Sequence, residues 1–430
     1  MLYSLYRRAA GSQFLRHNVI FVGGSTLVSF INYLYYPVLG RLMVPADFGE
    51  VQTIIAFFMQ ATVIFQVLSL TTIGALKRYE ADPDHRQKVI TELEWLALFV
   101  GAAIFLALII FAEPLRHFLQ FGSIVPFLLF AVTFLISIPI AFSNSYLQGQ
   151  RQFADLAKSN LAGSTSKLAL SAGFVLAGLR TVGAIVGLLL SQIINLIYTH
   201  VLAARVGRPR LLFHRHVPRW HLLRPELKFA GVLLVTSLCV NILLSIDIIT
   251  VKHYFPPTDA GLYAGISTIS RIIFFLTGPL SAVLIASVKL DDPAHNRALL
   301  KRSFALLMLL GGSTLAFFSL FPHFTIRLLL GERFLAYANQ LPTLSLAIFI
   351  LSLSNMLVFY HVLSKGRRVA VASAIGLSTM VIMLMLNHNS VPEVVRSMLV
   401  GSSILFILLI IIVNLKTRRG GSDHRKQDVS

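Results

Sequence analysis

The chain contains few charged residues, few acidic residues and almost no cysteine. Charged residues make up 13% of its 430 residues, whereas a typical soluble domain carries about 25%. It has 18 Asp and Glu against 37 Lys and Arg, and its single cysteine, Cys239, excludes an intramolecular disulfide. This composition excludes a disulfide-stabilised scaffold and is atypical of a soluble protein.

The chain instead contains long apolar segments, and 56% of its residues are hydrophobic. Most of the segments reach the roughly 20 residues that a helix needs to cross a bilayer, and they lack the alternating polarity of barrel strands. The pattern predicts an all-α polytopic membrane protein with twelve transmembrane helices. The expected spans are residues 17–40, 50–75, 93–112, 124–147, 157–178, 181–204, 229–251, 260–288, 303–321, 340–363, 369–387 and 396–415.

Positive charge alternates between the two sides of this predicted topology. The amino-terminal arm, the even-numbered connections and the tail hold 28 of the Lys and Arg residues, while the odd-numbered connections hold 7. Cytoplasmic connections collect positive charge, so we expect both termini in the cytoplasm and the protein in the cell (inner) membrane. The net charge of +19 is therefore a topology signal.

The two halves of the chain repeat one another at an offset of about 210 residues. The segment with Arg41, Asp47 and Gly49 has its counterpart in Lys252, Asp259 and Gly261. This repeat predicts two six-helix lobes related by a pseudo-two-fold axis along the membrane normal. The expected regions are a cytoplasmic interfacial arm (1–16), an N-terminal lobe (17–204), a basic cytoplasmic interfacial linker (205–228), a C-terminal lobe (229–415) and a cytoplasmic tail (416–430).

Several functional classes find no support in the residues. The positive charge is dispersed among short loops with no recognition motif, so nucleic-acid binding is not expected. His214, His216 and His221 in the linker have no acidic or cysteine ligand nearby, and no metal or cofactor is expected. The chain has no Walker loop, no HExxH pattern and no GxSxG elbow, so we do not expect an enzyme.

Ionisable residues inside the spans are few, and each costs about 2.5–3.5 kcal/mol at a helix centre unless it faces water or a partner. Lys167 lies near the middle of the fifth span, Arg271 near the middle of the eighth and Asp247 in the outer half of the seventh. Neutral polar positions within spans are Asn32, Gln60, Gln66, Asn144, Asn195, Asn241 and Asn355. These residues are the natural candidates for a binding site.

Three segments carry a resemblance to a known family: residues 33–50 (YLYYPVLGRLMVPADFGE), 147–153 (LQGQRQF) and 245–265 (SIDIITVKHYFPPTDAGLYAG). They resemble the oligosaccharide and polysaccharide flippases, which share a superfamily with multidrug exporters and lipid II flippases. The resemblance implies a secondary transporter that moves a polyprenyl-pyrophosphate-linked oligosaccharide from the cytoplasmic to the outer leaflet, by alternating access of two lobes. Its implied partners are this lipid-linked substrate, membrane lipids, and glycosyltransferases or a polymerase of a polysaccharide pathway.

For such a substrate, Arg271 is the first candidate to grip pyrophosphate, because guanidinium matches phosphate oxygens. A structural ion pair with Asp247 is the alternative, and Asp247 is also a candidate for coupling to an ion gradient. Lys167 either adds charge to the cavity or makes a structural hydrogen bond within its lobe. Arg41 either contacts substrate or anchors the outer end of the first span, and Asn32 is a neutral candidate for substrate binding.

Other functions remain open at this level. A multidrug or organic-ion exporter of the same superfamily fits the fold, although mid-span cations suit organic cations poorly. A polytopic glycan polymerase or acyltransferase would need a reactive pocket at one membrane face. The longest outer connection, about residues 322–339, is too short to form one. A non-transporting scaffold is the remaining alternative.

Overall fold

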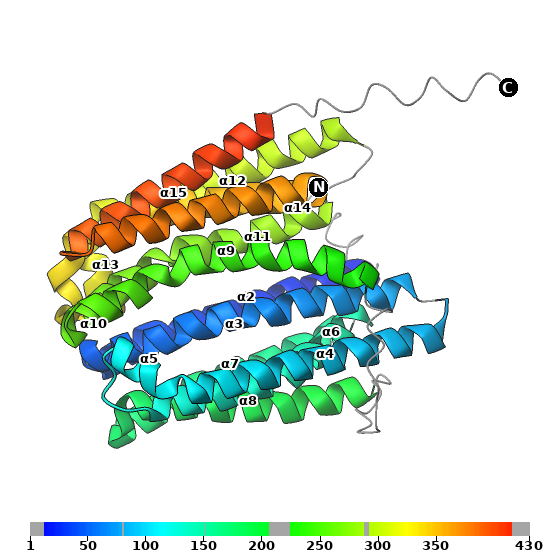
Figure 1. The fold of residues 1–430 in the computed structure, drawn as a ribbon, viewed down its shortest axis with the longest axis horizontal. Coiled ribbons are helices and arrows are strands. Elements are labelled where there is room, and N and C mark those ends of the chain that lie inside the picture. The colour runs from blue at the N-terminus through cyan, green and yellow to red at the C-terminus, as the bar shows by residue number, and fades with distance from the viewer. Residues whose placement is uncertain (1–12, 80, 151, 206–223, 288–291, 415–430) are drawn as a thin grey trace.

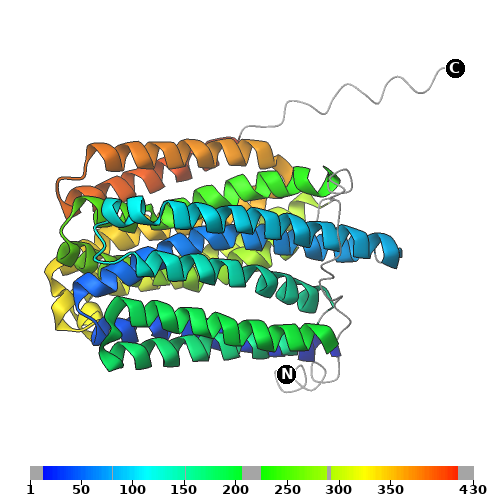
Figure 2. The ribbon, with the colours of Figure 1, turned by 60° about the horizontal axis from the view of Figure 1, so that its bottom comes forward.

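The structure is a computed structural model of the chain, and it describes residues 13–79, 81–150, 152–205, 224–287 and 292–414. Every regular element in these ranges is a helix, with no β-strand among the described residues. The long helices run in broadly the same direction in two different views (Figure 1 and Figure 2). The expected all-α fold is confirmed.

The N half of the chain occupies the lower part of Figure 1 and the C half the upper part. The N half consists of α2 (Gln13–Leu42), α3 (Pro45–Arg78), α4 (Pro83–Ile110), α5 (Ala112–Phe118), α6 (Val125–Gly149), α7 (Phe153–Phe174), the π-helical turn η1 (Val175–Leu179) and α8 (Arg180–Arg205). The C half consists of α9 (Arg224–Tyr254), α10 (Pro257–Ser270), α11 (Ile272–Ser287), α12 (Pro293–Leu320), α13 (Pro322–Leu329), the 3-10 helix η3 (Glu332–Gln340), α14 (Leu341–Leu386) and α15 (Val391–Asn414).

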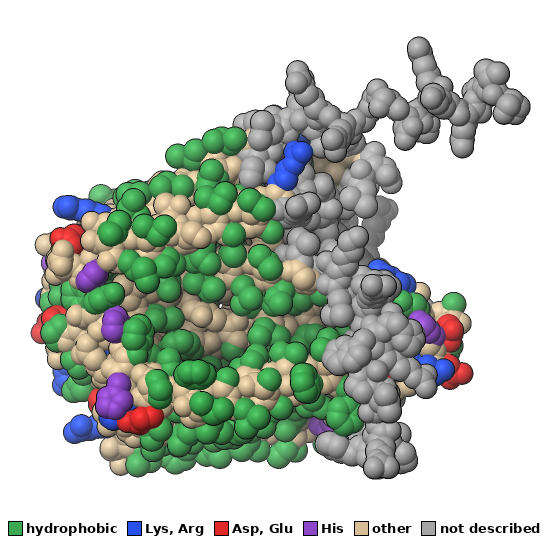
Figure 3. All heavy atoms as spheres, viewed as in Figure 1, with side chains coloured by type: hydrophobic (Ala, Val, Ile, Leu, Met, Phe, Trp, Pro, Cys, Tyr) green, Lys and Arg blue, Asp and Glu red, His purple; other side chains and the backbone are tan. Residues whose placement is uncertain are grey.

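The surface carries a wide apolar belt. Figure 3 shows hydrophobic side chains over the middle of this face, with charged and histidine side chains mainly at its two ends. Phe99, Leu176 and Leu320 are at least 70% exposed, which would be costly in water over so large an area. Ten described helical segments are long and apolar enough to cross a membrane. The chain is a multi-pass membrane protein.

Three expected spans differ from the observed elements. The eighth span is broken into α10 and α11, and Arg271 stands between them as the C-cap of α10. No helix end separates the tenth and eleventh spans, because both lie within α14, whose sequence has no proline at the expected turn. The exact number of crossings and the two-fold relation of the halves remain predictions.

Two helices begin about ten residues earlier than hydropathy predicts, and they begin in the same way. Asp82 and Asp292 each accept a hydrogen bond from the backbone N–H three residues on, at His85 (3.0 Å) and His295 (2.9 Å). Each aspartate is followed by proline at the first helical position, a combination that starts helices well. The capped starts of α4 and α12 are thus matching features of the two halves.

The two halves meet through α3, which packs against both α9 and α10. Gly49 on α3 and Gly261 on α10 lie so close that a Cβ on Gly261 would come within 1.7 Å of the Pro45 carbonyl oxygen. Phe48 packs edge-on against Phe334 of η3 beside this crossing, with ring centroids 5.4 Å apart. We call this end of the bundle, where α2 ends and α3 begins, the predicted outer end.

The expected regions are only partly within the described residues. α8 ends at Arg205 and α9 begins at Arg224, so the histidines of the predicted linker lie outside the described residues. Most of the predicted arm and the predicted tail also lie outside them. The division into five regions therefore remains a prediction.

Candidate functional site

Four helices of the N half each turn a stripe of residues toward a shared cavity. The lining positions recur at intervals of three or four residues, which is the spacing of one helix face. They come from α2, α3, α7 and α8. The lining residues are Val28, Asn32, Tyr36, Ile55, Phe58, Met59, Asn160, Gly163, Ser164, Lys167, Leu188, Ser191, Gln192 and Asn195.

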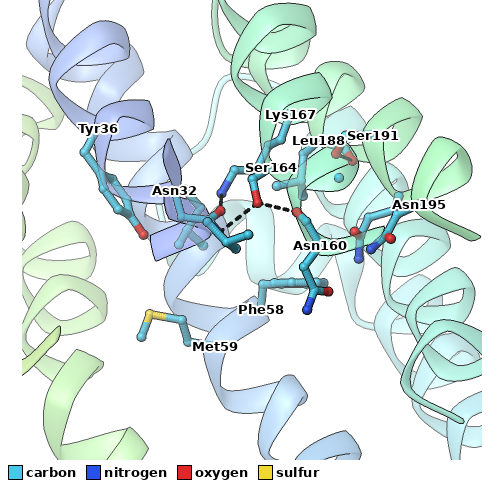
Figure 4. A pocket seen from close by; sticks show the side chains of 14 residues that line it. Asn32, Tyr36, Phe58, Met59, Asn160, Ser164, Lys167, Leu188, Ser191 and Asn195 are labelled. Carbon is cyan, nitrogen blue, oxygen red and sulfur yellow. Dashed lines mark hydrogen bonds between the residues drawn. The ribbon is translucent and has the colours of Figure 1, made fainter. Parts of the chain in front are cut away.

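This cavity, which we call the N-half pocket, has a volume of about 420 Å³. Figure 4 shows Asn32, Ser164 and Lys167 converging near its centre, with Tyr36 and Met59 to one side. Its polar lining combines three asparagines, one glutamine, two serines, one tyrosine and one lysine. Among the described residues that line it there is no carboxylate. The pocket is therefore polar and formally positive.

A short hydrogen-bond chain connects the two candidates that the sequence placed on separate helices. Lys167 Nζ donates to Asn32 Oδ1 at 2.5 Å, and Asn32 Nδ2 donates to Ser164 Oγ at 3.2 Å. The ammonium also lies 4.7 Å from the centroid of the Tyr35 ring. Lys167 is half-buried and has no ion-pair partner among the described residues. Within the described part of the chain, neutral dipoles and an aromatic face stabilise its charge.

Several polar groups in the pocket have hydrogen-bonding capacity to spare. The Asn195 carbonyl accepts from Ser159 (2.8 Å) and Thr199 (3.0 Å), which fixes the amide. Within the described part of the chain, no hydrogen bond uses the Asn195 Nδ2 group, the Asn160 side chain or the Tyr36 hydroxyl. These donors and acceptors are available to a ligand.

A second polar cluster lies in the C half and is sealed. The Asp247 carboxylate on α9 accepts from Tyr263 (2.9 Å), Ser267 (2.6 Å) and Arg271 (2.8 Å) of α10 and its C-cap. The side chains of Asp247 and Arg271 are 0% and 5% exposed. Three neighbouring groups satisfy this carboxylate, as a buried charge requires. The structure thus brings the two candidates together as an ion pair.

Arg271 keeps one donor that no described residue uses. Its Nη2 donates to Asp247, while its Nε is buried without a hydrogen-bond partner among the described residues.

The fifth candidate, Arg41, is remote from both clusters. Its exposed guanidinium donates to the backbone carbonyl of Leu328 on α13, which belongs to the other half. Nearby, Gln120 Nε2 donates to the His253 carbonyl at 2.7 Å. These are contacts between the halves at the predicted outer end.

Sequence inspection missed part of the sealed cluster and a buried cation that lies outside both clusters. Tyr263, Ser267 and Arg271 are spaced by four residues, so they share one face of a helix. That spacing was a usable signal. Lys252 was assigned to an outer loop, yet it is 1% exposed, and its ammonium lies 4.9 Å from the centroid of the Phe121 ring. No sequence pattern links those last two residues.

Comparison with known proteins identifies the family of the chain. The family profile described as "Polysaccharide biosynthesis protein" matches residues 15–286, which is more than half of the chain. The chain belongs to this family. No curated protein matches the chain by sequence.

Solved structures share the fold of this family member at low identity. An inward-facing multidrug resistance MATE family transporter of the MOP superfamily matches with a TM-score of 0.73 and 14% identity, covering 90% of this chain and 94% of the other. The lipid II flippase MurJ, in an inward closed conformation, matches with 0.73 and 12%, covering 92% and 87%. An outward-facing MATE transporter matches with 0.65 and 14%, covering 94% and 96%.

Proposed function

We propose that this chain is a flippase: a secondary transporter that moves a polyprenyl-pyrophosphate-linked oligosaccharide from the cytoplasmic to the outer leaflet. The observation that carries the proposal is the N-half pocket, which is polar and positive inside an apolar-surfaced member of the polysaccharide biosynthesis protein family. The polyprenyl tail can remain in lipid during transfer, whereas the sugar and pyrophosphate need a polar route between helices.

The pocket chemistry supports a hydroxyl-rich, anionic cargo. Asn32, Asn160 and Asn195 offer amides that both donate and accept, which suits sugar hydroxyls. Lys167 supplies the positive charge, and it has no competing carboxylate among the lining residues that the structure describes. Lys167 and Asn32 are therefore the substrate-binding residues we propose.

The buried pair suggests a second role in transport. In this conformation Asp247 holds Arg271 within the C half, so Arg271 is not free to bind pyrophosphate. We place pyrophosphate binding by Arg271 in a later conformation, where the anion competes with Asp247. A protonated Asp247 would release the arginine, and this is the way in which the carboxylate would couple transport to an ion gradient. Arg41 is assigned to the contact between the halves.

We further propose an inner-membrane location with both termini in the cytoplasm, from the distribution of Lys and Arg between alternate connections. Transport would proceed by rocking of the two halves. The enzymes that supply and consume the lipid-linked oligosaccharide, glycosyltransferases and a polymerase, would be its functional partners. The chain itself would carry out transport and no catalysis.

Export of organic cations is the rival function, because the fold is similar to that of multidrug transporters. Such cargo would meet Lys167 in a pocket without an opposing carboxylate among its described lining residues, which disfavours cation binding. The two functions predict different phenotypes when the protein is lost.

The test is to inactivate the gene and to measure the leaflet distribution of polyprenyl-linked oligosaccharide. We expect accumulation in the cytoplasmic leaflet, restored to normal by the wild-type gene. Lys167→Gln should fail to restore it, while Lys158→Gln on the same helix should succeed, because Lys158 is 62% exposed in a surface ion pair. Drug sensitivity without lipid accumulation would favour the exporter and refute the flippase.

A further inference from the structure

We propose that the N-half pocket binds an acidic sugar residue of the transported oligosaccharide, a residue that carries one carboxylate or a comparable single negative charge. This inference rests on the proposed function and adds the class of cargo. The pyrophosphate would then be bound elsewhere. The argument has three parts: the charge of the pocket, its hydrogen-bonding groups and its size.

The charge argument compares the two mid-span cations. Arg271 is neutralised by Asp247 at 2.8 Å. Among the described residues, the printed partners of Lys167 are neutral: the Asn32 amide oxygen and the Tyr35 ring. A half-buried cation within a membrane span is costly without a counter-charge, and an anionic ligand removes that cost. One unpaired ammonium matches one negative charge.

The hydrogen-bonding argument concerns the remaining lining. The Asn160 side chain and Asn195 Nδ2 have no partner among the described residues, and Ser164 and Gln192 flank them. Neutral amides and hydroxyls at several points around a cavity suit the ring of hydroxyls on a sugar. Phe58 offers an apolar wall of the kind that packs against the C–H groups of a sugar ring.

Pyrophosphate fits this pocket poorly. It carries more than one negative charge in a compact group and is usually met by arginine forks or by several cations, whereas the described lining has one lysine. The volume of about 420 Å³ falls at the small end of ligand pockets and holds about one or two sugar residues. The pocket is therefore a site for part of the glycan.

The first experiment analyses the lipid that accumulates when the gene is inactivated. The glycan is released from the polyprenyl carrier and its composition is determined by mass spectrometry. We expect at least one acidic residue in it. Accumulation of a wholly neutral glycan would overturn this inference and leave the flippase function standing, whereas no accumulation of any lipid-linked glycan would overturn both.

The second experiment measures binding to the purified full-length protein in detergent by saturation-transfer NMR. The probes are methyl β-glucuronide, its neutral analogue methyl β-glucoside and inorganic pyrophosphate. We expect the glucuronide to bind at least roughly tenfold more tightly than the glucoside, because only the glucuronide can form a charge-assisted hydrogen bond with Lys167. Lys167→Gln should abolish this difference, and Lys158→Gln, at the surface of the same helix, should keep it.

Three results would overturn the inference: equal binding of the two glycosides, displacement of the glucuronide by equimolar pyrophosphate, or no glucuronide signal from the wild-type protein. The comparison of the two glycosides uses wild-type protein alone, so it decides the question even if Lys167→Gln fails to fold. Size-exclusion chromatography of each variant establishes which comparisons are valid.

Discussion

Breaking the buried pair should separate the two roles that Arg271 can have. Arg271→Met leaves Asp247 without its cation, at a site where both side chains are at most 5% exposed. Removing one partner of a buried ion pair costs about 3–5 kcal/mol. With an unfolding entropy of about 2.1 cal/mol/K per residue over 430 residues, the midpoint of thermal unfolding should fall by about 3–6 °C.

The double variant Asp247→Asn/Arg271→Met should recover most of this loss. The asparagine is neutral, and its side-chain oxygen can still accept from Tyr263 and Ser267, which donate to Asp247 at 2.9 and 2.6 Å. Replacing both members of a buried pair by neutral groups is often close to neutral in stability. The measurement is thermal unfolding of purified protein in detergent, together with transport in cells.

Stability and transport, measured together, distinguish a structural role of the pair from a role in transport. A stable double variant that transports normally would make the pair purely structural, whereas a stable double variant without transport would show that the pair acts in transport, through pyrophosphate binding by Arg271 or ion coupling by Asp247. The control is Arg327→Met, which removes an exposed pair with Glu332 at 3.3 Å and should change the midpoint little. An Arg271→Met protein as stable as the wild type would refute the energetic argument.

Three further predictions concern the pocket and the predicted outer end. Lys167→Glu should reduce transport at least roughly tenfold, because it reverses the charge of the pocket. Lys167→Arg should keep part of the transport activity and Lys158→Glu all of it. Normal transport by Lys167→Glu would rule out the pocket as a cargo site. Gly261→Leu should lower both transport and the midpoint of thermal unfolding, because a Cβ there would lie 1.7 Å from a carbonyl oxygen of α3 and the two helices must separate; wild-type transport rates would contradict this. Phe48→Cys combined with Phe334→Cys should allow a short bifunctional thiol reagent to join the halves and stop transport, since the native rings are 5.4 Å apart. Cross-linked protein that still transports would show that this end need not open. The control is the parent chain, whose single cysteine is buried.

The fold could be predicted from hydropathy, but the ends of its helices could not. The early starts of α4 and α12 lie in polar turns, where the signal is the aspartate cap before a proline at Asp82 and Asp292. A search of the sequence for apolar windows does not detect such a cap. The break at Arg271 lies in an otherwise apolar segment and has no proline of its own, so no sequence signal marks it.

The sequence predicted individual residues of the candidate site but not which of them contact one another. Lys167 and Asn32 were identified because polar groups are rare in spans, but the sequence says nothing about a contact across 135 residues. The stripe from Asn160 to Lys167 on α7 is visible as a helical period, as is the stripe from Leu188 to Asn195 on α8. Which stripes face each other depends on the packing of α7 against α8, and that is a tertiary property. The pairing of Arg271 with Asp247 was open to prediction because their depths in adjacent spans are similar.

The crossing of Gly49 and Gly261 has a consequence for how the halves can part. At this point two bare backbones touch, with the Gly261 Cα only 2.8 Å from where a Cβ of Gly49 would be. The two glycines have no side chains that must unpack, so this contact itself can separate and re-form without rotamer changes. Bulkier partners would have to unpack before the contact opened. Two glycines thus form a contact at the predicted outer end that can open without unpacking side chains of their own.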